Sequence, residues 1–341
     1  MVMDMQRLET LPPPPGVIAS LQAGFGIVSS RIALIILPLL LDMLLWLGPR
    51  LSVGQWYEAF FNKSLSLLRQ NGFPAQELMF YTENASQVIG YFERLNWLIW
   101  LRTLPIGIPA LMLGVPENVP VQTPLGLQTV IQIPSSMIVL VTFLLLTLAG
   151  WLGGGTYFRS VAGASLGEDV PIAGLIWTFL QTIILSVIWF IGLVVIVFPI
   201  LFLIGLLTVI NALLAQAAFF IILFFLFWLV VPLFFTPHGI FVRRQNAFLS
   251  ILSSLRMSRF TLPTSSMFVL SVFLLSRGLS YLWLVPSSDS WLMLIGIAGH
   301  SFISTALLSA SFVYYRNMNH WLQTVYEQFQ QMNNRSSMKK V

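Results

Sequence analysis

Residues 171–235 read PIAGLIWTFLQTIILSVIWFIGLVVIVFPILFLIGLLTVINALLAQAAFFIILFFLFWLVVPLFF, a stretch without a single Asp, Glu, Lys or Arg. At about 1.5 Å per residue, one helix of this length would extend far beyond the roughly 30 Å hydrocarbon core of a bilayer. The simplest solution is two crossing helices, Ile172–Val197 and Ala212–Phe235, with Pro199–Asn211 as the turn. The stretch therefore predicts a helical hairpin inside a membrane.

The composition of the whole chain agrees with this prediction. Of its 341 residues, 57% are hydrophobic and only 9% are charged, whereas a soluble domain is about 25% charged. Cysteine is absent, which excludes disulfides, thiolate nucleophiles and Cys-ligated zinc. The three histidines, His238, His300 and His320, lie far apart in the sequence, so we predict neither a metal nor any other cofactor.

Six apolar segments are candidates for crossing the bilayer, and we expect an all-α, polytopic transmembrane helix bundle with six spans and a small helical extracytoplasmic cap. Its predicted parts, in chain order, are a cytoplasmic N-terminus with an interfacial helix (1–31), a first span (32–48), the cap (49–133), three spans (134–153, 171–198 and 211–235), a basic cytoplasmic helix (236–262), two further spans (263–285 and 290–315) and a cytoplasmic amphipathic tail (316–341). The polar end of that tail, from Gln328 onward, is expected to be disordered.

The distribution of Lys and Arg predicts the orientation, because cytoplasmic loops retain these residues. With six spans both termini share one side, and the cations on that side are Arg7, Arg31, Arg159, Arg243, Arg244, Arg256, Arg259, Arg316, Arg335, Lys339 and Lys340. The opposite side carries Arg50, Lys63, Arg69, Arg94 and Arg102, beside six acids. We therefore expect both termini to be cytoplasmic, in a bacterial cytoplasmic (inner) membrane.

Three ionisable residues fall inside predicted spans: Asp42, Arg277 and His300. Such residues are costly in hydrocarbon and mark candidate functional sites. Counted from the outer ends of their spans, all three lie roughly 9 to 14 Å deep, which predicts one polar layer with an Asp42–Arg277 ion pair. The simpler interpretation is a pair that fixes the register of two helices, and the alternative is a proton or ion relay in which His300 titrates.

Outside the spans, a predicted amphipathic helix carries Arg243, Arg244, Arg256 and Arg259 around an apolar stripe. This pattern is typical either of a helix on an anionic leaflet or of an ordinary positive-inside loop. The predicted partners are therefore the lipid bilayer, anionic head groups, and other membrane subunits contacting the cap or the C-terminal helix; nucleic acid is not expected. Gly150 and Gly154 predict close helix packing.

The predicted cap contains two amphipathic helices, one marked by Trp56 and Leu68 and the other by Val88 and Leu98. A proline-rich tract follows Arg102, where helices cannot persist. The simpler interpretation is a small cap that seals the bundle, and the functional one is a surface that docks a partner or gathers a substrate.

The order of features from Pro171 to Arg316 carries a resemblance. An apolar hairpin is followed by a short basic helix with small residues (Arg244–Ser250) and by two spans that end in Tyr314-Tyr315-Arg316. This arrangement resembles uncharacterised bacterial six-helix membrane proteins, including the membrane domain fused to some glycerophosphoryl diester phosphodiesterases. The resemblance implies an accessory role in the membrane and carries no catalytic residues.

The sequence contains no Walker loop, HExxH or GxSxG motif, so we predict that the protein is not an enzyme. The expected function is that of a scaffold, an assembly or accessory subunit, or a lipid-interacting protein. The main alternative is a small-solute or lipid transporter that uses Asp42, Arg277 and His300. The third is a cofactor- or pigment-bearing subunit of an energy-transducing complex.

Overall fold

A computed structural model describes residues 13–168 and 174–338. Five helices are long and apolar enough to cross a membrane, and the count rises to six if Val17–Ser30 and Ile32–Leu47 together form one broken span. The prediction of an all-α membrane helix bundle is therefore confirmed. Arg7, Lys339 and Lys340, which contributed to the predicted orientation, and the first residues of the third predicted span, 171–173, lie outside the described residues.

The chain divides into two compact units, which are described separately. Unit 1 comprises Met1–Leu34, Phe158–Ser276 and Ile303–Val341, and unit 2 comprises Ile35–Tyr157 and Arg277–Phe302. Helices α6 (Ser136–Leu166), α10 (Ala247–Trp283) and α11 (Met293–Met338) each contribute to both units.

Unit 2 contains α3 (Ile36–Leu47), the hairpin of α4 (Gly54–Gln70) and α5 (Ala75–Arg94), and the 3₁₀ turn η2 (Trp97–Leu101). Its strands are β1 (Arg50–Ser52), parallel to β4 (Val130–Gln132), and β2 (Gln122–Thr123), antiparallel to β3 (Gly126–Leu127). One apolar cluster joins the base of the α4–α5 hairpin to the start of α6 through residues that include Val53, Trp97 and Val139.

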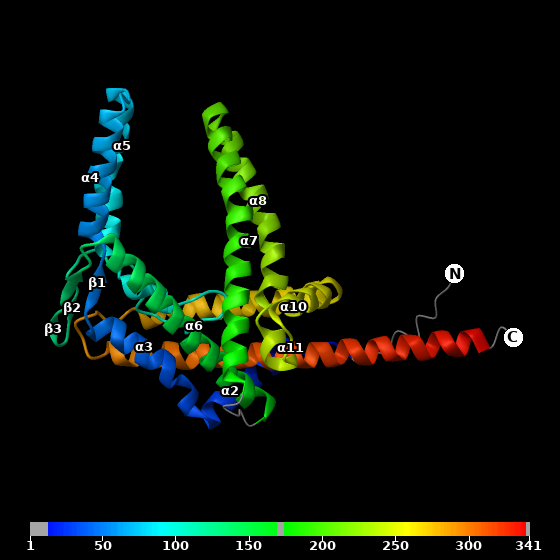
Figure 1. The fold of residues 1–341 in the computed structure, drawn as a ribbon. Coiled ribbons are helices and arrows are strands. Elements are labelled where there is room, and N and C mark those ends of the chain that lie inside the picture. Colours follow the sequence, from blue (N-terminus) through cyan, green and yellow to red (C-terminus); the bar gives the residue numbers. More distant parts are fainter. Residues whose placement is uncertain (1–12, 169–173, 339–341) are drawn as a thin grey trace. The chain divides into compact units, whose positions relative to one another are not determined.

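Unit 1 contains α2 (Val17–Ser30), α7 (Leu175–Ile210), α8 (Ala212–Phe234), α9 (His238–Arg243) and its parts of α10 and α11. Figure 1 shows α7 and α8 side by side as a long hairpin. The core lies where the base of the hairpin meets α10 and α11. There the Phe268 and Tyr314 rings stack with centroids 4.2 Å apart, and the Phe235 ring stacks on both.

The hairpin turn is shorter than the sequence predicted. Helix α7 continues through Pro199 to Ile210, and the turn is confined to Asn211. The Asn211 side-chain oxygen accepts hydrogen bonds from the Leu213 and Leu214 N–H groups and so caps α8. The predicted turn at Pro199–Asn211 was therefore wrong, because proline is tolerated inside membrane helices while the Asn cap provides the sharp start of the next helix.

Three other boundaries differ from the predicted ones. The first predicted span (32–48) follows non-helical backbone at Arg31 and begins with a 3₁₀ turn, η1 (Ile32–Ile35), before α3. The predicted basic helix (236–262) was wrong as one helix, because Arg244 adopts a left-handed conformation that ends α9 after Arg243, and α10 begins only at Ala247. The rest of it and the fifth span form the single element α10, with a kink at Thr261. Helix α11 is continuous to Met338, so the expected disorder from Gln328 onward is not found in the described part of the tail.

Candidate functional site

Asp42, the acid of the first predicted span, lies on α3 and is fully buried in unit 2. Its carboxylate accepts the Leu111 N–H with both oxygens, at 2.7 and 2.9 Å, and the Met112 N–H with Oδ1 at 2.9 Å. These two N–H groups belong to a non-helical segment and have no helical partner of their own. The carboxylate thus satisfies backbone donors that would be costly to leave unpaired in an apolar environment.

The side chain of Gln128 binds the C-terminal end of α3. The buried Gln128 amide nitrogen lies within hydrogen-bonding distance of the carbonyl oxygens of Leu45, Trp46 and Gly48, the shortest contact being 2.6 Å to Trp46. The last carbonyls of a helix lack intrahelical partners, so Gln128 caps this end. The Trp46 ring nitrogen in turn donates to the Ser288 carbonyl at 2.7 Å.

The segment that Asp42 holds packs along α6. A Cβ built on Gly150 would lie 2.7 Å from the Leu101 carbonyl oxygen, and one on Gly154 would lie 2.9 Å from both Gly107 Cα and the Ile106 carbonyl oxygen. Gly154 is 18 residues into α6, about 27 Å along its axis. Part of the predicted cap therefore runs beside the apolar span. The two glycines allow close packing as predicted, but against the backbone of this segment and not against another α-helix.

The other two members of the predicted polar layer behave differently from Asp42. His300 is 9% exposed, whereas the Arg277 side chain is exposed. The guanidinium of Arg102 interacts electrostatically with Asp42, Arg277 and His300. Unit 2 thus brings the three predicted residues into one neighbourhood, with Arg102 as a fourth member.

The Asp42–Arg277 ion pair expected from the sequence is not formed within the described residues. The Asp42 oxygens face the Leu111 and Met112 N–H groups instead. The physical reason is that unpaired backbone donors in the segment beside α6 compete for the same carboxylate. Those donors are fixed in place, whereas an arginine side chain must lose rotamer freedom to reach it.

The four arginines of the predicted basic helix separate into two pairs in unit 1. Arg243 and Arg256 line a groove of about 840 Å³, and Arg244 and Arg259 do not. The other polar lining residues are Gln245, Ser253, Asn319 and Gln323, and the apolar lining includes Leu249, Leu252, Phe260, Leu322, Tyr326 and Phe329. The groove therefore lies between the first half of α10 and the second half of α11, and Arg243 at the end of α9 completes it.

Hydrogen bonds fix the polar end of this groove. Arg243 donates to the Asn319 side-chain oxygen at 3.4 Å, and Asn319 donates to the Tyr315 carbonyl at 2.8 Å. Ser253 donates to the Gln245 side-chain oxygen at 2.8 Å. Within residues 13–168 and 174–338, the Arg256 guanidinium has neither a hydrogen bond nor an ion pair, so its charge is available to a ligand.

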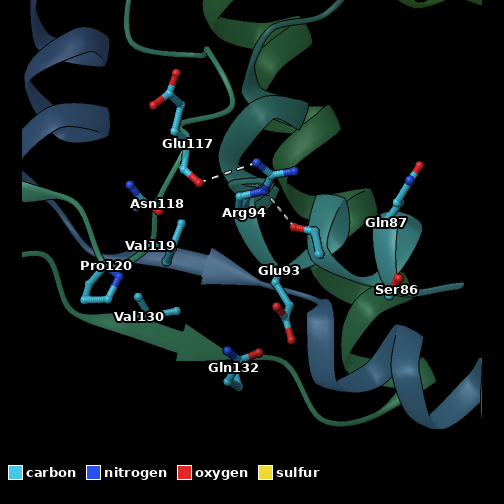
Figure 2. Close-up of a pocket in the computed structure, with 11 residues that line it drawn as sticks. Ser86, Gln87, Glu93, Arg94, Glu117, Asn118, Val119, Pro120, Val130 and Gln132 are labelled. Carbon is cyan, nitrogen blue, oxygen red and sulfur yellow. Dashed lines mark hydrogen bonds between the residues drawn. The ribbon is translucent and has the colours of Figure 1, made fainter. Parts of the chain in front are cut away.

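The cap contains a polar pocket of about 500 Å³, lined by residues of α5, of the loop around Glu117 and of β4. Figure 2 shows Arg94 bridging its upper side, where Nε donates to the Gly90 carbonyl at 3.0 Å and Nη1 donates to the Glu117 carbonyl at 3.4 Å. Val130 and Gln132 form the floor, and the Glu93 side chain extends beside Gln132. The guanidinium therefore holds the loop around Glu117 against α5.

Four residues that contribute to these sites were missed in the sequence. Leu111 and Met112 act through backbone N–H groups, which no residue pattern reveals, and Gln128 acts from a loop. Arg50 is buried at the start of β1, where it donates to the Arg94 carbonyl at 2.7 Å and where burial lowers the pKa of its guanidinium. The only available signal was Asp42 itself, the single acid within a predicted span.

Comparisons with protein-family models, with curated proteins and with solved structures find no match to this chain.

Proposed function

We propose that this protein is a non-enzymatic accessory or assembly subunit of a membrane, which presents the α7–α8 hairpin to another membrane-embedded protein. The proposal rests on one observation: most of α7 is exposed beyond the base of the hairpin. The buried side chains of α7 are Thr178, Gln181, Thr182, Leu185 and Ser186, all near its N-terminal end. Beyond Ser186, no described side chain of α7 is buried.

The free part has the dimensions of a membrane-crossing unit. Trp189 still donates a hydrogen bond to Thr236 at the base, and beyond it Phe190 to Ile210 form about 32 Å of helix, compared with roughly 30 Å of hydrocarbon. Within the described residues, α7 packs mainly against α8 and also contacts α9. A two-helix unit of this kind offers most of its circumference to its surroundings, whereas helices of a closed bundle bury theirs against several neighbours.

Small residues on α7 favour a protein neighbour over lipid alone. A Cβ placed on Gly192 or Gly205 would meet nothing within 4 Å, so both glycines leave open notches on the helix. Association of membrane helices depends on close van der Waals packing, and small residues allow it. We infer that these notches receive side chains of the partner.

The transport alternative has less support. A relay needs an acid that exchanges protons or ions along a path, but the Asp42 carboxylate is fully buried and accepts two backbone N–H groups. The arrangement fits a structural role, in which the Asp42 carboxylate (the brace) holds the segment beside α6 in place. The pigment alternative rests on His300 alone, one residue of the same neighbourhood.

The experiment is site-specific photo-crosslinking of the full chain in its native membranes. A photoreactive residue at Val195 or Phe198, both exposed on the free hairpin, should give one discrete protein adduct. The control position is Leu145, which is exposed on α6 and should give lipid adducts only. A Gly192→Leu substitution in the same chain should abolish the hairpin adduct by filling a notch. Lipid adducts alone at all three positions, or an adduct between two copies of this chain, would refute the proposal.

A further inference from the structure

We propose that the groove between α10 and α11 in unit 1 is a binding site for one anionic phospholipid, with its phosphate on Arg243 and Arg256 and an acyl chain along the apolar wall. This site is separate from the hairpin that carries the proposed function. The two inferences are therefore independent, and either one can fail without the other.

We infer that the groove lies at a membrane surface. Within unit 1, α10 and α11 pack antiparallel, since Phe268 stacks on Tyr314 while Met257 contacts Asn319. The groove includes the Met257–Asn319 contact and extends away from the Phe268–Tyr314 pair, before the kink at Thr261 on α10 and after Arg316 on α11. Two antiparallel spans leave the bilayer on the same side at these ends, so the groove opens where head groups and the first part of the acyl chains lie.

The charges in the groove favour a ligand with net negative charge. Arg243 and Arg256 line it, and no Asp or Glu is among the lining residues that the structure describes. The guanidinium group matches the oxygens of a phosphate through paired hydrogen bonds. Asn319 holds the Arg243 side chain in position, and Arg256 contributes a guanidinium with no described protein partner.

The walls of the groove favour a lipid over an acidic peptide. Leu249, Leu252 and Phe260 come from α10, and Phe329 comes from α11; all four are exposed. Tyr326 adds an aromatic side chain of the kind enriched at the membrane interface. A continuous apolar wall next to two cations fits an acyl chain below a phosphate, whereas an acidic peptide would offer several charges and little apolar surface.

The experiment is native mass spectrometry of the full-length protein in detergent, with a phosphatidylglycerol of two oleoyl chains as the probe. The wild-type chain should retain one phosphatidylglycerol at concentrations where dioleoyl phosphatidylcholine is not retained. Each arginine near an anionic surface contributes on the order of 1 kcal/mol to binding. The double substitution Arg243→Gln/Arg256→Gln should therefore weaken retention about 30-fold, and Arg256→Gln alone about fivefold.

The matched control is Arg244→Gln/Arg259→Gln, which removes the same charge from the same region outside the groove. It should change retention by less than about threefold. Because Arg256 has no described protein partner, the single substitution also separates lost binding from misfolding. Equal losses in the two double variants would show that only general surface charge acts and would overturn the proposal. Equal retention of phosphatidylcholine, or retention of polyglutamate in place of phosphatidylglycerol, would overturn it as well.

Discussion

Helices α6 and α7 are both long, apolar and glycine-containing, yet their glycines serve opposite purposes. On α6, Gly150 and Gly154 lie against the backbone of residues 101–107, where a Cβ would come within 3 Å of backbone atoms. On α7, Gly192 and Gly205 face open space. The same residue type thus marks a filled contact on one helix and an empty one on the other.

The difference shows that hydropathy selects helices for the membrane but does not determine what covers them. The window of highest hydropathy averages 2.1 on α6 and 3.2 on α7, and the more apolar helix is the less covered one. The backbone that covers α6 at these glycines belongs to η2 and to the non-helical segment after it, and Asp42 accepts two N–H groups of that segment. A polar residue on α3 thus maintains the packing of an apolar helix.

The largest expected effect comes from removing the brace. Asp42→Ala leaves the Leu111 and Met112 N–H groups buried without acceptors, each at a cost of about 1 to 3 kcal/mol, so we expect the free energy of unfolding to fall by about 3 kcal/mol. Asp42→Asn retains one acceptor oxygen and should lose about half as much. Unfolding of the purified protein by a graded detergent mixture measures both. Equal stability of the alanine variant and the wild type would show that Asp42 does not stabilise the segment beside α6.

A smaller effect is expected from filling the covered glycine on α6. Gly154→Val places side-chain atoms against Gly107 and Ile106, and overpacking of this kind costs about 2 kcal/mol. The matched substitution on α7, Gly192→Val, meets nothing and should change stability by less than about 0.5 kcal/mol. The same unfolding assay compares the two variants. Similar losses at both positions would mean that α7 is covered within the chain itself.

The smallest effect is expected at Arg277. Its side chain is exposed, and it forms no ion pair with Asp42 in the described part of the chain, so Arg277→Gln should change the free energy of unfolding by no more than about 0.5 kcal/mol. This result would show that Asp42 stabilises the fold by binding backbone N–H groups and not by pairing with Arg277. Loss of a buried partner costs about 3 to 5 kcal/mol, so a change of that size would restore the ion pair as the stabilising interaction.

The sequence predicted the elements of the fold better than their contacts. The apolar stretches at 137–152 and 263–285 correspond to parts of α6 and α10, because a run of apolar residues has one stable arrangement in a bilayer, the helix. The turn at Pro199–Asn211 was wrong because the effect of a proline depends on its surroundings. The non-helical backbone beside α6 was not foreseen, since its prolines indicated a loop and nothing indicated where the loop lies.

The candidate sites likewise divide into residues that the sequence identified and contacts that it did not. Asp42 was singled out because a charge inside a span is costly wherever it lies, and the structure supplied its partners. The four arginines of the basic helix look equivalent in sequence, but the structure separates Arg243 and Arg256, which line the groove, from Arg244 and Arg259, which do not. That separation depends on α11, more than 50 residues away in sequence.

By itself, the sequence determined that this protein is a membrane-crossing helical chain and which of its residues are out of place in hydrocarbon, because both follow from the transfer of single side chains and short segments between water and lipid. Only the tertiary structure decided that Asp42 holds a backbone segment, that the glycines of α6 are covered and those of α7 are open, and that two arginines share a groove. These are relations between residues distant in the chain, and they depend on packing and hydrogen-bond competition, which composition does not encode.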